Sequence, residues 1–325
     1  MTTGQPGPPD PAVARLALDL AARVRDAVAP SLGEPGARVG VGVAPGGDVT
    51  MAIDEIAEYV TEACCNEAGD IAFYSEDRGY LEIGRPRAIL LIDPIDGTRP
   101  AAAGLESCCV SVAVLPPSRA ATLGDVQFGV VHEIKSGQRF FATRGEGARA
   151  ERADGSPLPI ALSENVDLRA LFWASGLRGR PALASAVLLE ELIDGCSMHG
   201  GFFDLGSATF DMTRIVTGQL DAYVDMGWLM VHELPALEAA FRRAGDGRIC
   251  TNFPYDVAAA ALIVTEAGGI VTAADGGSLE ASPAIGSGDG WGVAVLASAS
   301  RSLHDQLLVA TESGMQRLRA HVVGN

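Results

Sequence analysis

Residues 87–98 read Arg-Ala-Ile-Leu-Leu-Ile-Asp-Pro-Ile-Asp-Gly-Thr, an apolar run that stops on two carboxylates. The run is short enough for a buried strand, and such a strand delivers Asp93 to its end. Pro94 forces an extended or turn geometry on its neighbour, so we expect the chain to double back until Asp96 shares a site with Asp93. Gly97 can adopt backbone angles that other residues avoid, and it lets a ligand approach closely.

Thr98 reads as the start of a helix. Threonine is a good N-cap, and residues 99–103 (Arg-Pro-Ala-Ala-Ala) suit a first helical turn, where proline is tolerated. A helix start presents free N–H groups and a positive dipole to an anion. Carboxylates beside that anion would repel it unless a cation lay between them, which indicates Mg²⁺ bridging protein to phosphate. The plain alternative is a strand, an acidic turn and a capped helix without a ligand.

The composition limits the classes of function. The chain has 325 residues, 48% of them hydrophobic, which suits one large unit or two closely packed domains. Its 41 acidic and 24 basic residues leave a net charge of −17, which argues against a nucleic-acid polymer as partner. A phosphorylated substrate would also be repelled at long range, so metal ions would have to reverse the sign of the charge at the site.

Cellular location is inferred from the cysteines and from apolar segments. The six cysteines form two adjacent pairs and two singles, which fits neither a zinc pattern nor a secreted disulfide framework. We therefore expect reduced core residues in a cytoplasmic protein. Residues 1–12 show no secretory signal, and no uncharged apolar segment reaches the roughly 20 residues of a membrane helix.

Four strings of this sequence resemble motifs of one superfamily. Residues 93–98 (Asp-Pro-Ile-Asp-Gly-Thr) resemble the signature of the lithium-sensitive, Mg²⁺-dependent phosphatases, which include inositol monophosphatases and fructose-1,6-bisphosphatases. Residues 252–260 resemble its W-D-x-A-A motif, with Tyr255 in place of tryptophan. The superfamily carries a D-x-V-T-x-x-D string at the place of residues 48–54 (Asp-Val-Thr-Met-Ala-Ile-Asp), where valine and threonine come one position earlier. Residues 75–77 (Ser-Glu-Asp) match its S-E-E string with a shorter second acid.

The resemblance runs from about residue 48 to the C-terminal helix, and it implies a fold. That fold is an α+β or α/β protein, a layered αβαβα sandwich of the sugar-phosphatase type. An N-terminal antiparallel sheet with helices would be followed by a smaller C-terminal α/β half. We expect a disordered tail at 1–10, an N-terminal domain with the metal site at 11–155, and a C-terminal domain at 156–325 with an insertion at about 226–251.

The resemblance also implies a set of metal ligands. Glu76 and Asp93, with the Ile95 carbonyl, would hold one Mg²⁺ ion. Asp93, Asp96 and Asp256 would hold a second, and each site would take two or three ions. Taken without the resemblance, a surface acidic turn explains Glu76 and a helix-start aspartate explains Asp256.

Further residues are assigned to water and substrate by the same resemblance. Thr98, hydrogen-bonded near Glu76, would orient the attacking water, and the Gly97 and Thr98 amides would bind phosphate. Ser207 and Ala208 open a helix whose start contacts the organic part of the substrate in relatives, although a plain N-cap explains Ser207 equally well.

Asp48 is expected near the metals, although it or Thr50 could simply cap the helix that follows. Asp54 is expected to contact the metal ligands at most, and not the metals themselves.

Three departures from the superfamily pattern leave the substrate open. Arg99 and Pro100 replace the usual asparagine and aromatic residue, and Arg99 is either a solvated helix residue or a clamp for a second anionic group. The segment 226–251 is longer than in a typical inositol monophosphatase and could cap the site or pack against a second subunit. Tyr255 is shorter than the usual tryptophan.

These observations predict a Mg²⁺-dependent phosphomonoesterase that uses metal-activated water on a small phosphorylated polyol, sugar or nucleotide. The alternatives are a 3′-phosphoadenosine-5′-phosphate phosphatase, a fructose-1,6-bisphosphatase or, less favoured, a catalytically silent regulatory homologue. The expected partners are a small phosphorylated metabolite and further copies of the chain, in a homodimer or higher homo-oligomer, with no membrane.

Overall fold

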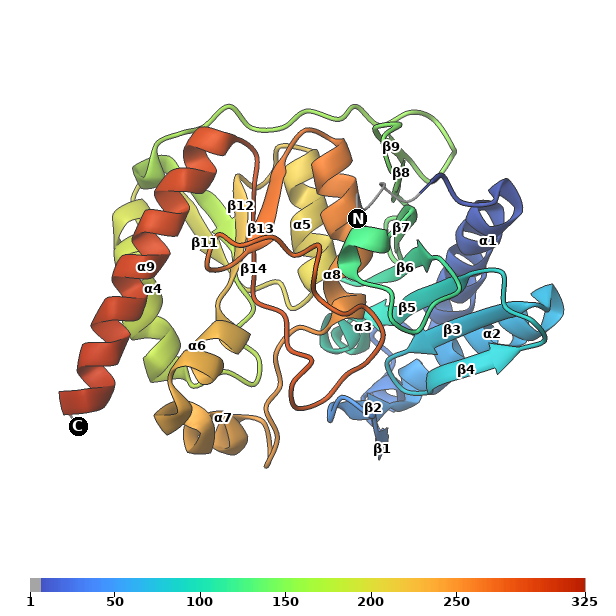
Figure 1. Ribbon diagram of the computed structural model, residues 1–325, viewed down its shortest axis with the longest axis horizontal. Coiled ribbons are helices and arrows are strands. Elements are labelled where there is room, and N and C mark those ends of the chain that lie inside the picture. Colours follow the sequence, from blue (N-terminus) through green and yellow to red (C-terminus); the bar gives the residue numbers. More distant parts are fainter. Residues whose placement is uncertain (1–6, 325) are drawn as a thin grey trace.

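Two large β-sheets form the centre of the computed structural model, which describes residues 7–324 (Figure 1). The first sheet has the strand order β4-β3-β5-β6-β7-β8-β9, and the second has the order β11-β10-β12-β14-β13. The strands are β1 Gly40–Val43, β2 Val49–Met51, β3 Ile71–Ser75, β4 Gly79–Ile83, β5 Ile89–Asp96, β6 Cys109–Leu115, β7 Phe128–Glu133, β8 Arg139–Thr143, β9 Ala148–Glu151, β10 Phe172–Ala174, β11 Gly201–Phe203, β12 Ala222–Asp225, β13 Ile270–Ala273 and β14 Val295–Ser298. The helices are α1 Pro11–Val28, α2 Ala52–Ala68, α3 Thr98–Ala103, α4 Ala182–Cys196, α5 Ala208–Val216, α6 Gly227–Glu233, α7 Glu238–Ala244, α8 Pro254–Glu266 and α9 Arg301–Gly324.

Strand β5 is the apolar run quoted above, and it lies inside the first sheet between β3 and β6. Its side chains alternate between two cores: Leu90 and Ile92 pack with α1 and α2, whereas Ile89 and Leu91 face α5 and α8. A strand that is covered on both faces needs apolar side chains throughout, which explains the unbroken run. Strands β3 and β5 are parallel, so the sheet is mixed and not purely antiparallel as expected. The β3–β4 hairpin occupies one side of β3, and β5 pairs with its other side.

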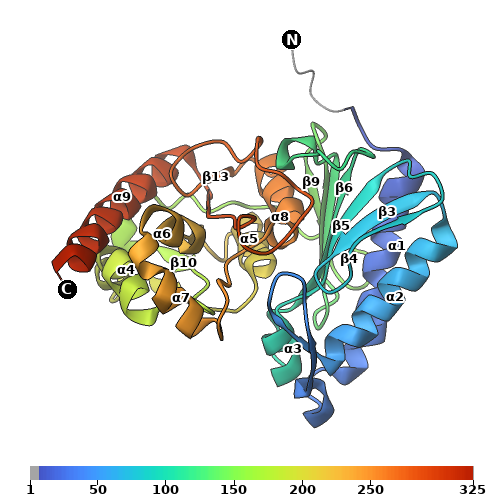
Figure 2. The same cartoon turned by 60° about the horizontal axis from the view of Figure 1, so that its bottom comes forward.

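Five layers follow from these cores. Helices α1 and α2 cover the outer face of the first sheet, α5 and α8 fill the space between the sheets, and α4 and α9 cover the outer face of the second sheet (Figure 2). The second sheet divides its side chains accordingly, since Tyr223 faces the middle layer while Ala222 and Val224 face α4 and α9. The predicted layered αβαβα sandwich is therefore confirmed.

The second sheet is parallel over β10, β11 and β12 and antiparallel over β13 and β14. The carboxyl ends of parallel strands meet at one edge of a sheet, and ligands of open α/β sheets bind beside that edge. The loops that leave β10 and β11 there are residues 175–181 and 204–207.

The elements expected from hydrophobic periodicity lie close to their predicted places. Apolar residues recur at helical spacing from 11 to 28, which predicts a helix there, and α1 has these bounds, Pro11–Val28, with Asp10 as its N-cap. The segment 226–251 contains the two short helices α6 and α7. The link between β9 and β10 joins the two sheets, and we propose it as the domain boundary, near residue 155.

The predicted disordered tail, residues 1–10, is only partly inside the described range, since residues 1–6 lie outside it. Residues 7–10 differ from the prediction. The Gly7 carbonyl accepts a hydrogen bond from Gln127 Nε2 at 2.7 Å, and Asp10 pairs with Arg87 at 3.0 Å. These contacts fasten the segment to the first sheet.

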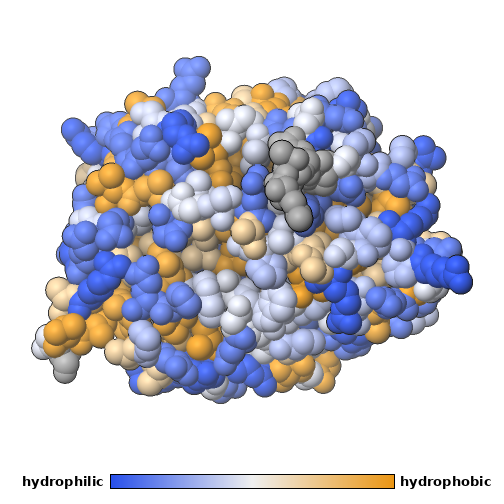
Figure 3. Space-filling model, in the orientation of Figure 1, coloured by the Kyte–Doolittle hydropathy of each residue, from blue (hydrophilic) through white to orange (hydrophobic). Residues whose placement is uncertain are grey.

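The cysteines and the surface agree with the composition. All six thiols are unpaired; five are buried and Cys250 is half-buried. Figure 3 shows hydrophilic and apolar residues interspersed over the visible face. Among the described helices, none combines the length and the apolar character that a membrane crossing requires.

Candidate active site

A β-bulge near the end of β5 brings two carboxylates to one side of the strand. Asp93 pairs with Ser111 and Asp96 pairs with Cys109, so three steps along β5 match two steps along β6. Side chains three positions apart point to opposite faces of a regular strand, and one extra residue corrects this. The Ile95 amide donates to Asp93 Oδ1 at 3.0 Å within the bulge. The chain thus stays in the strand to Asp96 and does not double back as we expected.

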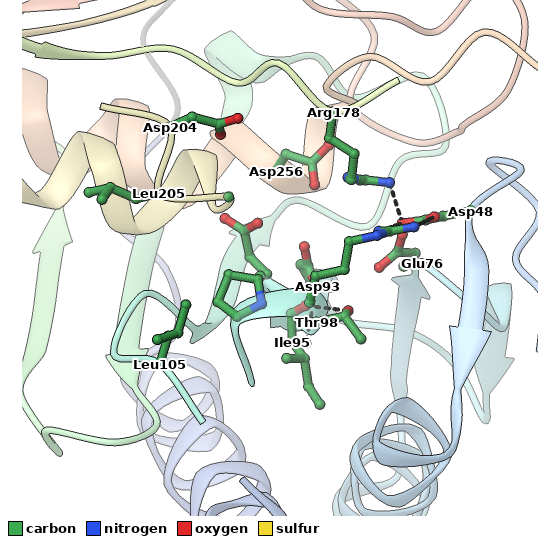
Figure 4. Close-up of a pocket in the computed structure, with 15 residues that line it drawn as sticks. Asp48, Glu76, Asp93, Ile95, Thr98, Leu105, Arg178, Asp204, Leu205 and Asp256 are labelled. Carbon is green, nitrogen blue, oxygen red and sulfur yellow. Dashed lines mark hydrogen bonds and ion pairs between the residues drawn. The ribbon is translucent and has the colours of Figure 1, made fainter. Parts of the chain in front are cut away.

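Asp256 reaches the same place from the middle layer. It lies in the first turn of α8, where the Phe253 amide donates to Asp256 Oδ2 at 2.5 Å. Carboxylate oxygens of Asp93, Asp96 and Asp256 all lie within 4.8 Å of one another. Residues more than 150 positions apart therefore form one cluster, and Figure 4 shows Asp93 and Asp256 pointing toward each other.

Glu76 joins the cluster because β3 and β5 are parallel neighbours. Ser75 pairs with Ile92, so the next residues, Glu76 just after β3 and Asp93 within β5, lie at the same level of the two strands. Glu76 lines the same cavity as the three aspartates (Figure 4). The four carboxylates that the sequence predicted as metal ligands thus share one cavity.

The carboxylates raise one another's pKa. Burial is the largest cause for each, and it raises the pKa of Glu76 and Asp93 well above the ordinary range. Burial and the charge of Asp96 raise the pKa of Asp256 to about 8. Asp96 shifts upward less, because it accepts hydrogen bonds from Thr209 N at 2.6 Å and Ser207 Oγ at 2.8 Å. A divalent cation would stabilise the ionised cluster, and all-oxygen ligands suit Mg²⁺.

Gly97 and Thr98 begin α3 in a different way from the prediction. Gly97 is the N-cap, with φ of +91°, and Thr98 is the first helical residue. The Thr98 hydroxyl donates to the Ile95 carbonyl at 3.2 Å, and its nearness to Asp54 partly offsets the rise that burial causes in the pKa of that carboxyl. These partners replace the expected hydrogen bond near Glu76. Helix α3 has only 6 residues, so the dipole at its start is smaller than the sequence argument assumed.

Ser207 and Ala208 are buried and do not line the cavity, contrary to the prediction. Ser207 is the N-cap of α5, where its hydroxyl accepts from the Phe210 amide at 3.1 Å and donates to Asp96. Their predicted place at the cavity is taken by Asp204 to Gly206, the residues just before them.

Tyr255 packs below the site without lining the cavity. It stacks on Tyr74 with ring centroids 6.2 Å apart, and its hydroxyl has no hydrogen-bond partner among the described residues. Burial raises its pKa well above the ordinary value. Tyr255 therefore supports the site through packing.

Asp48 lies at the cavity wall but caps no helix. The N-cap of α2 is Met51, whose amide donates to Asp54 at 2.7 Å, so the capping alternative for Asp48 and Thr50 is wrong. Asp48 instead accepts hydrogen bonds from Arg99 and from Arg178, a residue that the sequence analysis did not identify.

Arg178 and Asp204 had a signal in the sequence that was not used. Both follow strands of the C-terminal half, β10 and β11, and those strands are parallel. Residues after parallel strands are expected at a ligand site. Predicting that β10 and β11 are parallel would have required recognising α4, which lies between them in the chain, as the helix that connects two parallel strands.

The cavity itself measures about 340 Å³, and it opens between the two sheets (Figure 4). Its described lining consists of Asp48, Glu76, Asp93, Ile95, Asp96, Gly97, Thr98, Arg99, Pro100, Leu105, Arg178, Asp204, Leu205, Gly206 and Asp256.

A five-layer α+β fold with an acid-lined cavity between its sheets defines the class of the sugar-phosphatase-type proteins. The chain belongs to the inositol monophosphatase family, whose model matches residues 12–316.

The chain is similar to several known members. It is 27% identical over 274 residues to the fructose-1,6-bisphosphatase/inositol-1-monophosphatase of Methanothermobacter thermautotrophicus, covering 82% of this chain and 85% of that protein. It is 26% identical over 234 residues to the Nus factor SuhB of Pasteurella multocida, covering 71% and 73%. Among solved structures, the Thermotoga maritima IMPase TM1415 is similar with a TM-score of 0.68 and 21% identity, covering 94% of this chain and 99% of that one.

Proposed function

We propose that this chain is a Mg²⁺-dependent phosphomonoesterase that hydrolyses a small phosphorylated polyol, sugar or nucleotide. The observation that carries the proposal is the convergence of Asp93, Asp96 and Asp256 within 4.8 Å, with Glu76 in the same cavity. These carboxylates come from β5, from α8 and from the residue after β3. Burying several negative charges together is costly, and cation binding is the function that explains it best.

The residues fit the metal ions that the family uses. Glu76, Asp93 and the Ile95 carbonyl would hold one Mg²⁺ ion, and Asp93, Asp96 and Asp256 would hold another. When bound, such ions neutralise phosphate oxygens, lower the pKa of a bound water and stabilise the leaving alkoxide. The raised pKa values of Glu76 and Asp93 support this fit, because burial of like charges disfavours their ionised forms and a bound cation would offset that cost.

The protein's own groups would position water and phosphate. The Thr98 hydroxyl donates its single proton to the Ile95 carbonyl at 3.2 Å, and the Asp54 carboxylate is near enough to serve as the alternative acceptor. With its proton held by an acceptor, the oxygen can accept a hydrogen bond from the attacking water. The Gly97 and Thr98 amides lie at the cavity wall and would donate to phosphate oxygens.

Phosphate release tests the proposal. Purified protein with Mg²⁺ should release phosphate from at least one member of a panel of inositol phosphates, sugar bisphosphates, 3′-phosphoadenosine-5′-phosphate and nucleoside monophosphates. Asp93→Asn and Asp256→Asn should each lower kcat/KM by more than about 100-fold, because each removes a metal ligand. Asp154→Asn, which changes a fully exposed aspartate by the same atoms, should keep wild-type activity. Full activity in both site variants would refute the assignment.

A second candidate is a catalytically silent regulatory homologue, because the chain is also similar to a protein named Nus factor SuhB. This candidate predicts no phosphate release by a folded protein, whatever the substrate. Calorimetry separates the two, since the silent homologue has no need for Mg²⁺ binding that depends on Asp93 and Asp256.

We also propose that the protein acts in the cytoplasm as a homodimer or higher homo-oligomer. The unpaired thiols support a reducing compartment. Light scattering coupled to size-exclusion chromatography should give a mass of at least two chains, and a monomer at micromolar concentration would contradict this part.

A further inference from the structure

Two arginines meet one aspartate at the wall of the cavity. Arg178 Nη1 donates to Asp48 Oδ2 at 2.7 Å. Arg99 donates to both oxygens of the same carboxylate, at 3.2 and 3.3 Å. Figure 4 shows Arg178 extending across the cavity wall toward Asp48, and all three residues line the cavity that holds the acidic cluster. The arrangement places two guanidinium groups against one carboxylate.

The charges and donors of this cluster are unbalanced. Asp48 also accepts from the Val49 amide at 2.8 Å, and its pKa is lowered, against the effect of burial, by Arg178 and Arg99. Across residues 7–324, Nη1 is the only atom of the Arg178 side chain with a hydrogen-bond partner. The Arg178 side chain lines the cavity and is 45% exposed. The cluster therefore keeps one net positive charge and free donors.

The loop that carries Arg178 is held rigidly. Arg180 forms a buried ion pair with Asp225 at the end of β12, and Arg180 Nη1 donates to the Arg178 carbonyl at 2.7 Å. Gly179 lies so close to Cys250 that a Cβ there would be 2.6 Å from the Cys250 Cβ. A side chain whose backbone is fixed from both sides loses less entropy on binding a ligand.

The segment 226–251 contacts the backbone beside Asp48, the acidic member of the cluster. Arg248, near the end of that segment, donates to the Gly47 carbonyl at 2.6 Å. Gly47 has φ of +99°, and a Cβ there would lie 2.5 Å from Arg248 Cδ. The residue before Asp48 is therefore packed against the inserted segment, which gives this segment a part in shaping the cavity wall.

We propose that Arg178 and Arg99 form a subsite for a second anionic group on the substrate, separate from the phosphoryl group that is cleaved. The proposal rests on the proposed phosphomonoesterase function. Guanidinium groups bind phosphate or carboxylate oxygens through paired hydrogen bonds, which gives direction as well as charge. A protein with a net charge of −17 would otherwise repel a substrate with two anionic groups.

The alternative is that Arg178 only balances the acidic cluster, since its charge also acts on Glu76 and Asp256. Metal ions would balance those carboxylates in the working enzyme, and the charge of Arg178 would then be available to substrate. The alternative predicts that loss of Arg178 affects every substrate equally, whereas the subsite predicts a selective effect.

Matched substrate pairs separate these outcomes. Fructose 1,6-bisphosphate and fructose 1-phosphate differ by a second phosphate, and 3-phosphoglycerate and glycerol 3-phosphate differ by a carboxylate. We expect wild-type kcat/KM to favour the member with the second anion in at least one pair. Preference in the first pair alone identifies a phosphate as the second group, and preference in the second pair alone identifies a carboxylate. No preference in either pair overturns the proposal.

Variants then assign the preference to residues. Arg178→Gln and Arg99→Gln should each reduce the ratio of kcat/KM within the preferred pair by about 10- to 100-fold, the effect of losing a charged hydrogen bond. Arg149→Gln, an exposed arginine on β9, removes the same charge and should leave the ratio unchanged. Arg178→Lys keeps the positive charge but lacks the paired N–H groups of the guanidinium, so it should show a smaller fall in the same ratio. This variant provides the test if Arg178→Gln folds poorly. An equal fall for both members of a pair overturns the proposal.

A binding measurement keeps this inference distinct from the proposed function. If no member of either pair is hydrolysed, the phosphomonoesterase assignment fails. In that case Kd values for the same pairs are measured by calorimetry. A ratio of Kd values within a pair that falls in Arg178→Gln still supports an anion subsite. Equal Kd values within both pairs overturn it.

Discussion

Asp54 is a buried acidic residue next to Thr98. It is 8% exposed, it accepts from the Met51 amide, and burial raises its pKa to about 7. Through its contact with Thr98 it can fix the direction of the hydroxyl that we place beside the attacking water. The sequence analysis gave Asp54 no such position, because nothing in the string 48–54 shows which of its two aspartates would face Thr98.

Asp54→Asn should lower kcat at least about 10-fold, because the amide cannot hold the Thr98 proton as a carboxylate does. Combining it with Thr98→Val should add little further loss, since both act on one hydrogen bond. Glu55→Gln changes the neighbouring acid, which pairs with Arg78 outside the site, and should keep wild-type kcat. If the double variant lost kcat by the product of the two single-variant factors, the two residues would act independently, which would contradict the shared role.

Gly97 has both a backbone and a packing reason to be glycine. Its φ is +91°, and a Cβ there would lie 2.4 Å from the Ser107 carbonyl oxygen. We expect Gly97→Ala to lower the free energy of unfolding by more than about 2 kcal/mol, since backbone strain and a collision add. Gly145→Ala is the matched control, because Gly145 has φ of +79° but no atom within 4 Å. Urea denaturation should therefore show the smaller loss for Gly145→Ala, of about 1 kcal/mol, and equal losses would refute the packing argument.

At the scale of elements, His304 joins α9 to two strands of the second sheet. Thr272 Oγ1 donates to the Ala273 carbonyl at 2.7 Å and lies 2.9 Å from His304 Nε2. Nδ1 lies 2.9 Å from Ser298 Oγ on the other strand. Burial, with Arg301 nearby, lowers the pKa of His304 to about 4. The neutral ring is therefore part of the contact between α9 and the sheet.

Acid should weaken this contact between pH 6.5 and pH 4. In that interval the unfolded state binds a proton at His304 and the folded state does not, so the free energy of unfolding falls, by up to about 3 kcal/mol. In chemical denaturation at pH 7 and pH 4.5, His304→Gln should lose less stability than wild type on acidification. His199→Gln, an exposed histidine, should lose as much as wild type. The same acid-induced loss in all three proteins would rule out this role.

The sequence predicted elements better than their connections. Helical spacing located α1, and an apolar run located β5, because periodicity reports which face of an element is covered. The bulge between Asp93 and Asp96 was not predicted, since it depends on the pairing with β6. Arg178 was missed for a related reason: its importance comes from the parallel order of β10, β11 and β12, which involves strands almost 50 residues apart. The resemblance to family motifs identified the four carboxylates, because each motif marks a residue that reaches the shared site only after the chain has folded.

For the whole molecule, the site is the place where its layers meet. The first sheet supplies Glu76, Asp93 and Asp96, the middle layer supplies Asp256, and the loop after β10 in the second sheet supplies Arg178. Negative charge is thus concentrated where the two sheets face each other, in a protein that already has a net charge of −17. This concentration weakens the metal-free fold and strengthens cation binding, so the stability of the whole chain should respond to Mg²⁺.

Mg²⁺ should stabilise the folded protein by about 2.7 kcal/mol when its concentration is about 100 times its Kd, because only the folded state holds the site. Asp256→Asn should abolish this gain and yet have a metal-free Tm equal to or above that of wild type. The substitution removes a carboxyl group that is costly to ionise in the metal-free protein, as its pKa of about 8 indicates, while the amide oxygen can still accept from Phe253 N. Asp154→Asn should keep both the wild-type Tm and the full response to Mg²⁺ in a thermal melt. A metal-free Tm several degrees lower for Asp256→Asn would show that Asp256 stabilises the fold directly, and it would remove the argument that this charge is retained for cations.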